Sequence, residues 1–196
     1  MSIFMSSVYI PTGGWMLTEK EVFYAMPFMP VTGEPRIWDS NNEEHERYIN
    51  LCRKIYSSKY KNSNSYYYLF NEDLLDTFES FFNWTDARTV IPIGSTHPLV
   101  YHFADYISSA IGCSTLDVIN KVEKGVFTLD NNKTLPEGKI LLVDDIITSG
   151  SAIVSAIQTL LKTGKYQLED IDILCIGKTE RDLNVWDNNK VIANLT

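Results

Sequence analysis

The sequence is poor in cysteine and has no long apolar run. Its three cysteines, Cys52, Cys113 and Cys175, are far apart and do not have the spacing of metal ligands, so we expect reduced thiols in a cytoplasmic protein. No apolar run approaches the roughly 20 residues that a membrane span needs. The first residues lack a basic segment and are broken by Pro11 and Gly13. We therefore expect neither a signal peptide nor a membrane anchor.

Positive charge is also scarce. The 196 residues include 17 Lys and Arg against 25 Asp and Glu, a formal net charge of −8. An acidic surface repels the phosphate backbone, which disfavours direct nucleic-acid binding. The remaining composition, 44% apolar and 21% charged, is ordinary for a soluble globular protein. This length is enough for one domain with a sizeable appendage.

The two halves of the chain have different patterns. Residues 1–38 are rich in Gly, Pro and aromatics, which predicts loops and short strands. Apolar residues at helical spacing predict helices over residues 41–58 and 71–84. Strand and helix patterns alternate after residue 86. We therefore predict an N-terminal, aromatic-rich, helical and irregular hood over residues 1–85 and an α/β core over residues 86–196.

The predicted core elements alternate in type along the chain. Short apolar runs predict strands over residues 89–93, 115–119, 126–129, 139–143 and 171–176, and amphipathic patterns predict helices over residues 97–111 and 150–162. This alternation predicts a mostly parallel sheet with helices on both faces. The run KILLV at residues 139–143 is typical of a parallel strand that is covered on both faces.

The segment KILLVDDIITSGSAI, residues 139–153, is the most informative. Its apolar strand leads into Asp144 and Asp145, and a short loop then precedes a helix. A helix N-terminus with nearby hydroxyls suits a phosphate group, and open α/β sheets bind ligands at the carboxyl ends of their strands. Adjacent carboxylates can accept hydrogen bonds from vicinal sugar hydroxyls or hold a hard cation that also contacts phosphate. The alternative is a solvated strand end followed by a helix cap.

The stretch VDDIITSGSAI resembles the phosphoribosyl-pyrophosphate motif of the type I phosphoribosyltransferases. The resemblance implies that Asp144 and Asp145 hold the ribose 2- and 3-hydroxyls, with Mg²⁺ bound mostly through the ligand. It also implies a loop around the 5-phosphate, made of Thr148, Ser149, Gly150, Ser151 and Ala152. Many members have Thr where Ala152 stands, and some orotate-type members have Ala. Thr148 is similar to orotate-type and ComF-like members and argues against a hypoxanthine or guanine substrate.

The resemblance further implies a pyrophosphate loop and a mobile loop. The first corresponds to Gly94, Ser95 and Thr96, for which a helix cap is the alternative. The second corresponds to residues 120–125, where Lys121 and Lys124 would stabilise the leaving pyrophosphate; solvated surface lysines are the alternative. Two further cations, Lys178 and Arg181, follow the last strand. They are candidates for contacts with substrate or with a second copy in a homodimer, and a charged surface loop explains them equally well.

Three readings of the function remain after these observations. The first is a pentosyltransferase that moves ribosyl 5-phosphate between phosphoribosyl pyrophosphate and a nitrogenous base, with Mg²⁺. The second is a ComF-like regulatory protein that binds phosphoribosyl pyrophosphate or a nucleotide without catalysis. A different phosphate ligand is a third reading. In the first case the hood, with Tyr66, Tyr67, Tyr68 and Phe70, would contact the base, although core packing explains most of its aromatics.

Overall fold

A computed structural model describes residues 3–28, 43–60, 66–94 and 97–179. Its strands are β1 (Phe4–Gly13), β2 (Met16–Phe28), β3 (Thr89–Pro92), β4 (Ser114–Thr115), β5 (Ile119–Glu123), β6 (Val126–Leu129), β7 (Ile140–Ile147) and β8 (Ile171–Thr179). Its helices are α1 (Glu43–Tyr60), α2 (Tyr66–Tyr68), α3 (Leu75–Phe82), α4 (Leu99–Ile111) and α5 (Ser151–Leu161). A π-helical turn, η1 (Leu69–Asp73), and a 3₁₀ turn, η2 (Leu168–Asp170), complete the described elements.

Six strands form the central sheet in the order β1-β2-β8-β7-β3-β4. All neighbouring pairs from β2 to β4 are parallel, and β1 pairs with β2 in the antiparallel direction. The apolar run of β7 lies between β8 and β3, and its residues from Ile140 to Val143 are buried. Both faces of a central parallel strand are covered, which explains this continuous apolar pattern. The predicted mostly parallel α/β sheet is confirmed.

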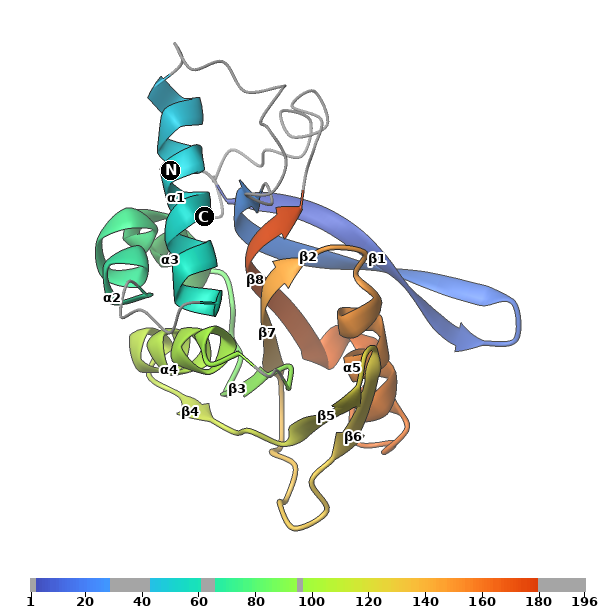
Figure 1. The fold of residues 1–196 in the computed structure, drawn as a ribbon. Helices are drawn as coiled ribbons and strands as arrows, with labels where there is room; N and C mark the ends of the chain where they lie inside the picture. The colour runs from blue at the N-terminus through green and yellow to red at the C-terminus, as the bar shows by residue number, and fades with distance from the viewer. Residues whose placement is uncertain (1–2, 29–42, 61–65, 95–96, 180–196) are drawn as a thin grey trace.

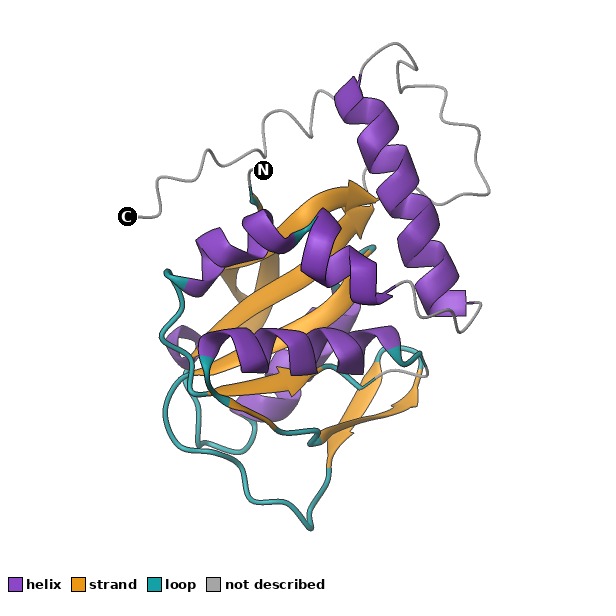
Figure 2. Cartoon of the chain, turned by 90° about the vertical axis from the view of Figure 1, so that its left-hand side faces the viewer, coloured by secondary structure: helices purple, strands orange, loops and turns teal. Residues whose placement is uncertain are grey.

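Helices cover both faces of this sheet (Figure 1). The helices α1 to α4 lie on one side of the sheet, and Figure 2, viewed from that side, shows the shorter helices in front of the strands and the long α1 beside them. The other face is covered by α5, beside the separate antiparallel hairpin of β5 and β6. Helix α4 ends at Gly112, whose φ of 70° is the left-handed conformation that glycine adopts readily at helix ends. This end agrees with the prediction from the sequence.

The N-terminal segment differs from its prediction. Instead of loops and short strands, β1 and β2 form a long hairpin, and β2 continues into the sheet by pairing with β8. Seven consecutive residues of β2, from Val22 to Phe28, are buried. The tip of the hairpin extends away from the rest of the described chain (Figure 1). The predicted hood therefore contributes strands to the same sheet as the predicted core.

Other boundaries differ in smaller ways. The predicted helix over residues 71–84 is divided by Leu74, the residue between η1 and α3. The predicted loop over residues 120–125 is mostly strand and turn of the β5–β6 hairpin. Strand β7 continues four residues beyond its predicted end, so both acids lie inside it. No helix in the described residues is long and apolar enough to cross a membrane.

Candidate sugar-phosphate site

The two adjacent acids, Asp144 and Asp145, lie in the second half of β7. Side chains alternate between the two faces of a strand, so neighbouring residues point in opposite directions. Asp144 lines a cavity on the α5 side, and Asp145 forms an ion pair with Lys59 of α1, on the other side of the sheet. The sequence motif therefore places one carboxylate on each face.

The loop after β7 turns sharply into α5. Gly150 is the N-cap residue of α5 and has a φ of 76°, a conformation that residues with a side chain rarely adopt. A Cβ atom at this position would lie 2.8 Å from Cγ1 of Val8, so β1 also requires glycine here. As glycine has no side chain to cap a helix, the N-terminal N–H groups of α5 remain suited to an anion.

One cavity of about 350 Å³ brings most of the predicted residues together. Asp144 enters it from β7, and the loop that follows forms an adjoining wall. All five predicted phosphate-loop residues line this cavity: Thr148, Ser149, Gly150, Ser151 and Ala152. The Ser149 hydroxyl donates to Ser151 Oγ at 3.0 Å, so the hydroxyls of the loop lie close together. The acid and the hydroxyl-rich loop thus share one concave site.

The β5–β6 hairpin supplies basic residues to the same cavity. Lys121 belongs to β5 and Lys124 to the turn before β6, where Gly125 has a φ of 75°. Both lysines are exposed and line the cavity, across from Asp144 and the loop. The predicted loop is thus a hairpin, and it still brings both lysines to the site. Their catalytic role stays a prediction.

Asp145 is almost completely buried and has a basic partner from outside the predicted core. Its two carboxylate oxygens, Oδ1 and Oδ2, lie 2.8 and 2.7 Å from Nζ of Lys59, in the last turn of α1. The side chains of Lys59 and Asp145 are 17% and 5% exposed. The backbone N–H of Ile146 also donates to Oδ1, at 2.6 Å. Sequence reasoning missed Lys59, because nothing local distinguishes it from a surface lysine.

Burial, followed by the adjacent Asp145 carboxylate, raises the pKa of Asp144 from its ordinary value of 3.8 to about 7. Lys59 and Lys121 act in the opposite direction, as does the backbone N–H of Asp145, which donates to Asp144 Oδ1 at 2.8 Å. A raised pKa of this kind is common where a carboxylate lies in a functional cavity.

The predicted pyrophosphate loop is described only in part. Ser95 and Thr96 lie outside the described residues. Gly94 is buried, and a Cβ atom there would lie 2.2 Å from the carbonyl oxygen of Ile119 and 2.8 Å from the backbone nitrogen of Lys121. Glycine at this position therefore allows β5 to approach closely, whether or not the loop also binds an anion.

The oxygen donors at the cavity can be compared with the preferences of magnesium. Mg²⁺ prefers oxygen donors and usually retains several waters beside one or two carboxylates and phosphate oxygens. Asp144 and the loop hydroxyls offer such donors. The described residues contain no group of three or more His, Cys, Asp or Glu arranged to hold a metal by themselves. The described donors at this cavity would therefore suit an ion that keeps several of its waters.

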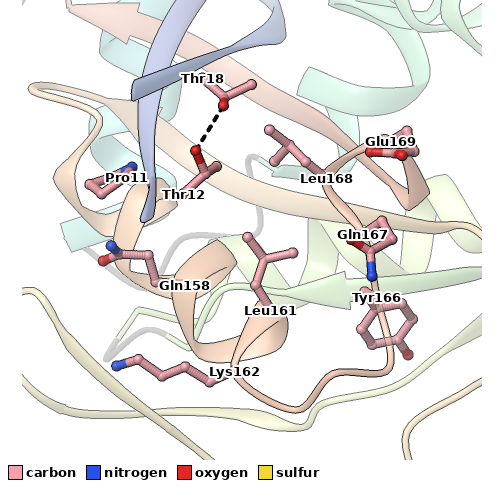
Figure 3. A pocket seen from close by; sticks show the side chains of 10 residues that line it. All are labelled: Pro11, Thr12, Thr18, Gln158, Leu161, Lys162, Tyr166, Gln167, Leu168 and Glu169. Atoms are coloured by element: carbon pink, nitrogen blue, oxygen red, sulfur yellow. Dashed lines mark hydrogen bonds between the residues drawn. The ribbon is translucent and has the colours of Figure 1, made fainter. Parts of the chain in front are cut away.

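A larger cavity of about 510 Å³ lies between the β1–β2 hairpin, the C-terminal half of α5 and η2. Figure 3 shows its lining, in which the hydroxyls of Thr12 and Thr18 lie 3.0 Å apart and the remaining side chains are mostly amide or apolar. Its lining includes the start of the three-residue turn η2, which the Gln167 and Asp170 side chains already cap, and no N-terminus of an α-helix. Its size therefore does not make it the better candidate site.

The aromatic residues of the hood divide into packed and exposed groups. Phe70 is buried against Phe78, Phe103 and Tyr106, as expected for core residues. The ring of Tyr66 stacks on His102, with centroids 3.9 Å apart. Tyr67 and Tyr68 are exposed, and neither lines the cavity at Asp144. Contact of these tyrosines with a base remains a prediction. Lys178 belongs to β8, and Arg181 lies outside the described residues.

Comparison with known proteins gives a remote likeness to phosphoribosyltransferases. No family model and no curated protein matches the chain. An adenine phosphoribosyltransferase from Saccharomyces cerevisiae, solved with adenine, is 18% identical over 61% of this chain and 71% of that one, with a TM-score of 0.41. An orotate phosphoribosyltransferase from Aeropyrum pernix is 12% identical over 76% and 70% of the two chains, with a TM-score of 0.36. These values are too low to support an argument, so the strand pairing alone establishes the fold class.

Proposed function

We propose that this protein binds phosphoribosyl pyrophosphate with magnesium and transfers its ribosyl 5-phosphate to or from a nitrogenous base. One observation supports this most directly. A single cavity is lined by Asp144, by all five residues of the hydroxyl-rich loop and by two lysines. A bare phosphate would need no carboxylate, and a neutral sugar would need neither the helix N-terminus nor the lysines. A phosphorylated sugar uses all three.

Each group has a distinct part in the proposed reaction. The residues from Thr148 to Ala152 surround the 5-phosphate at the N-terminus of α5. Ionised Asp144 accepts hydrogen bonds from the ribose hydroxyls and fixes the sugar. Lys121 and Lys124 offset the charge that develops on the departing pyrophosphate. Catalysis then depends on orientation and charge stabilisation rather than on a covalent nucleophile. Bound magnesium would neutralise the pyrophosphate as it leaves.

Calorimetric titration with phosphoribosyl pyrophosphate, with and without Mg²⁺, tests the binding step. Asp144→Asn, alone and with Asp145→Asn, should weaken binding by about tenfold or more, because each carboxylate–hydroxyl bond is charge-assisted. Asp105→Asn is the matched control, since Asp105 is exposed on α4 and does not line the cavity. Equal affinity in all four proteins would show that the acids do not hold the ribose.

A regulatory, non-catalytic function is the second candidate. The ion pair of Asp145 with Lys59 occupies one of the two acids, and the lysines stand on a short hairpin. Pyrophosphate release separates the candidates, measured with adenine, guanine, hypoxanthine, uracil and orotate as acceptors. Magnesium-dependent binding without release for any base would contradict the transferase proposal and favour the regulatory one.

A further inference from the structure

The hydroxyl-rich loop before α5 borders two cavities. Gly125, Ser149 and Ser151 line the 350 Å³ cavity at Asp144, and the same three residues line a second cavity of about 490 Å³, the β1–α5 groove. The rest of the groove's lining comes from β1 and α5: Ser7, Val8, Tyr9, Val154, Ser155 and Gln158. Its size is within the range of about 300–1,000 Å³ that is usual for small-molecule sites. A phosphate at the loop would therefore have a cavity on each side.

The groove follows the outer edge of β1. Val8 points toward α5, because a Cβ atom at Gly150 would lie 2.8 Å from its Cγ1. Side chains alternate along a strand, so Ser7 and Tyr9 point to the opposite face. All three residues line the groove, and β1 is the edge strand of the described sheet. A molecule in the groove would thus lie between the edge of β1 and α5.

The two cavities differ in charge. Asp144, Lys121 and Lys124 line the first one, whereas none of the described residues that line the β1–α5 groove is charged. Side chains such as Ser155 and Gln158 can both donate and accept hydrogen bonds. A second anion would find no cation inside the groove. An uncharged polar group, such as a nucleoside, would find hydrogen-bond partners there.

Tyr9 gives the groove an aromatic surface. This residue is 57% exposed, so its ring is accessible to a ligand. An accessible aromatic ring can stack on any planar base. The ring therefore favours a nucleoside over a sugar without a base.

We infer that the site binds a dinucleotide, in which ribose 5-phosphate is joined through its phosphate to a second nucleotide, with the second nucleoside in the β1–α5 groove. The ribose lies at Asp144, and both phosphates stay at the shared loop, where Lys124 directly precedes Gly125. The second base stacks on Tyr9. This inference rests on the proposed function, because it assumes the positions of the ribose and the 5-phosphate. It adds the substrate class that the same site accepts.

Ribose 5-phosphate and ADP-ribose test this inference, because ADP-ribose is ribose 5-phosphate joined to adenosine monophosphate. Both are titrated calorimetrically, with Mg²⁺, into the wild-type protein, Tyr9→Ala and Ser155→Phe. The wild-type protein should bind ADP-ribose more tightly by about fivefold or more, the effect of stacking one base. Tyr9→Ala removes the stacking ring, and Ser155→Phe fills the groove. Each should abolish most of this gain and leave the affinity for ribose 5-phosphate unchanged.

Tyr67→Ala is the matched control. Tyr67 is similarly exposed, at 59%, and lines neither cavity, so its loss should change neither affinity. If Ser155→Phe does not fold by circular dichroism, Tyr9→Ala is sufficient for the test. ADP-ribose binding no tighter than that of ribose 5-phosphate, or a gain that survives the substitutions, would overturn the inference. The proposed function would still stand if the wild-type protein binds phosphoribosyl pyrophosphate, and failure to bind any of the three ligands would contradict it.

Discussion

At the scale of single residues, the acid pair shows how much the direction of a side chain matters. Asp144 and Asp145 are neighbours in the chain, but strand geometry gives them opposite faces and different partners. Asp144 lines the cavity with the loop and has a raised pKa, whereas Asp145 pairs with Lys59. Substituting one acid should therefore not reproduce the effects of substituting the other.

Asp144→Asn tests the raised pKa through stability. The folded protein retains a proton on Asp144 up to about pH 7, whereas the unfolded chain loses it near the ordinary value of 3.8. The free energy of unfolding of the wild-type protein therefore decreases as pH rises through this window. Asparagine does not titrate and keeps the oxygen that accepts from the N–H of Asp145. The variant should gain about 1 kcal/mol or more relative to wild type between pH 4 and pH 8.

Urea unfolding at several pH values measures this difference. Asp105→Asn, at an exposed position of α4, should show no comparable trend. A stability difference between Asp144→Asn and wild type that stays constant from pH 4 to pH 8 would mean that Asp144 is ionised normally in the folded protein.

At the scale of elements, the close contact of the β3 end with β5 positions the lysine hairpin. There is no room for a Cβ atom at Gly94, because it would collide with the backbone of Ile119 and Lys121. Backbone atoms cannot rotate away as a flexible side chain can. The absence of a side chain at Gly94 therefore allows the β5–β6 hairpin to lie beside the cavity.

Gly94→Ala should displace the hairpin and lower the free energy of unfolding by about 2 kcal/mol, within the usual range for overpacking. Gly138→Ala is the comparison. Gly138 has open space around it but a φ of 79°, so only the cost of a left-handed alanine, about 1 kcal/mol, applies. Denaturant titration would measure both. Equal losses in the two variants would argue against the close contact at Gly94.

At the scale of the whole molecule, the hairpin and the later strands form one sheet. Strand β2 pairs with β8 from Phe23, opposite Leu174, to Phe28, opposite Thr179. This pairing joins the two sides of the boundary that the sequence predicts near residue 86. Removing the first half of the chain would expose one edge of β8 and the apolar face that the helices of the hood cover. An exposed parallel strand edge is prone to aggregation.

The fragment 86–196 should therefore fail to fold cooperatively. Size-exclusion chromatography and thermal unfolding followed by circular dichroism would test this. Trp15→Ser in the full chain is the control, since Trp15 is fully exposed at the hairpin tip and its loss should change stability by less than about 0.5 kcal/mol. A monomeric fragment with a sharp unfolding transition would support a true domain boundary at residue 86.

The sequence alone determined the elements whose cause is local. The run KILLV predicts a buried strand because apolar residues are continuous there, and α4 ends at Gly112 because a left-handed residue is needed at that point. The order of apolar strand, Asp144, hydroxyl loop and helix likewise predicts the wall of one cavity, since these residues are close together in the sequence. Short-range geometry is sufficient for each of these features.

Only the tertiary structure decided which distant segments meet. The N-terminal residues form strands because β8 offers an edge to pair with, a condition that their own composition does not show. Lys59 reaches Asp145 from 86 positions earlier in the chain, because α1 packs against β2 on that side of the sheet. Strand pairing and helix packing depend on surfaces brought together by folding, and no local pattern of residues encodes the partner.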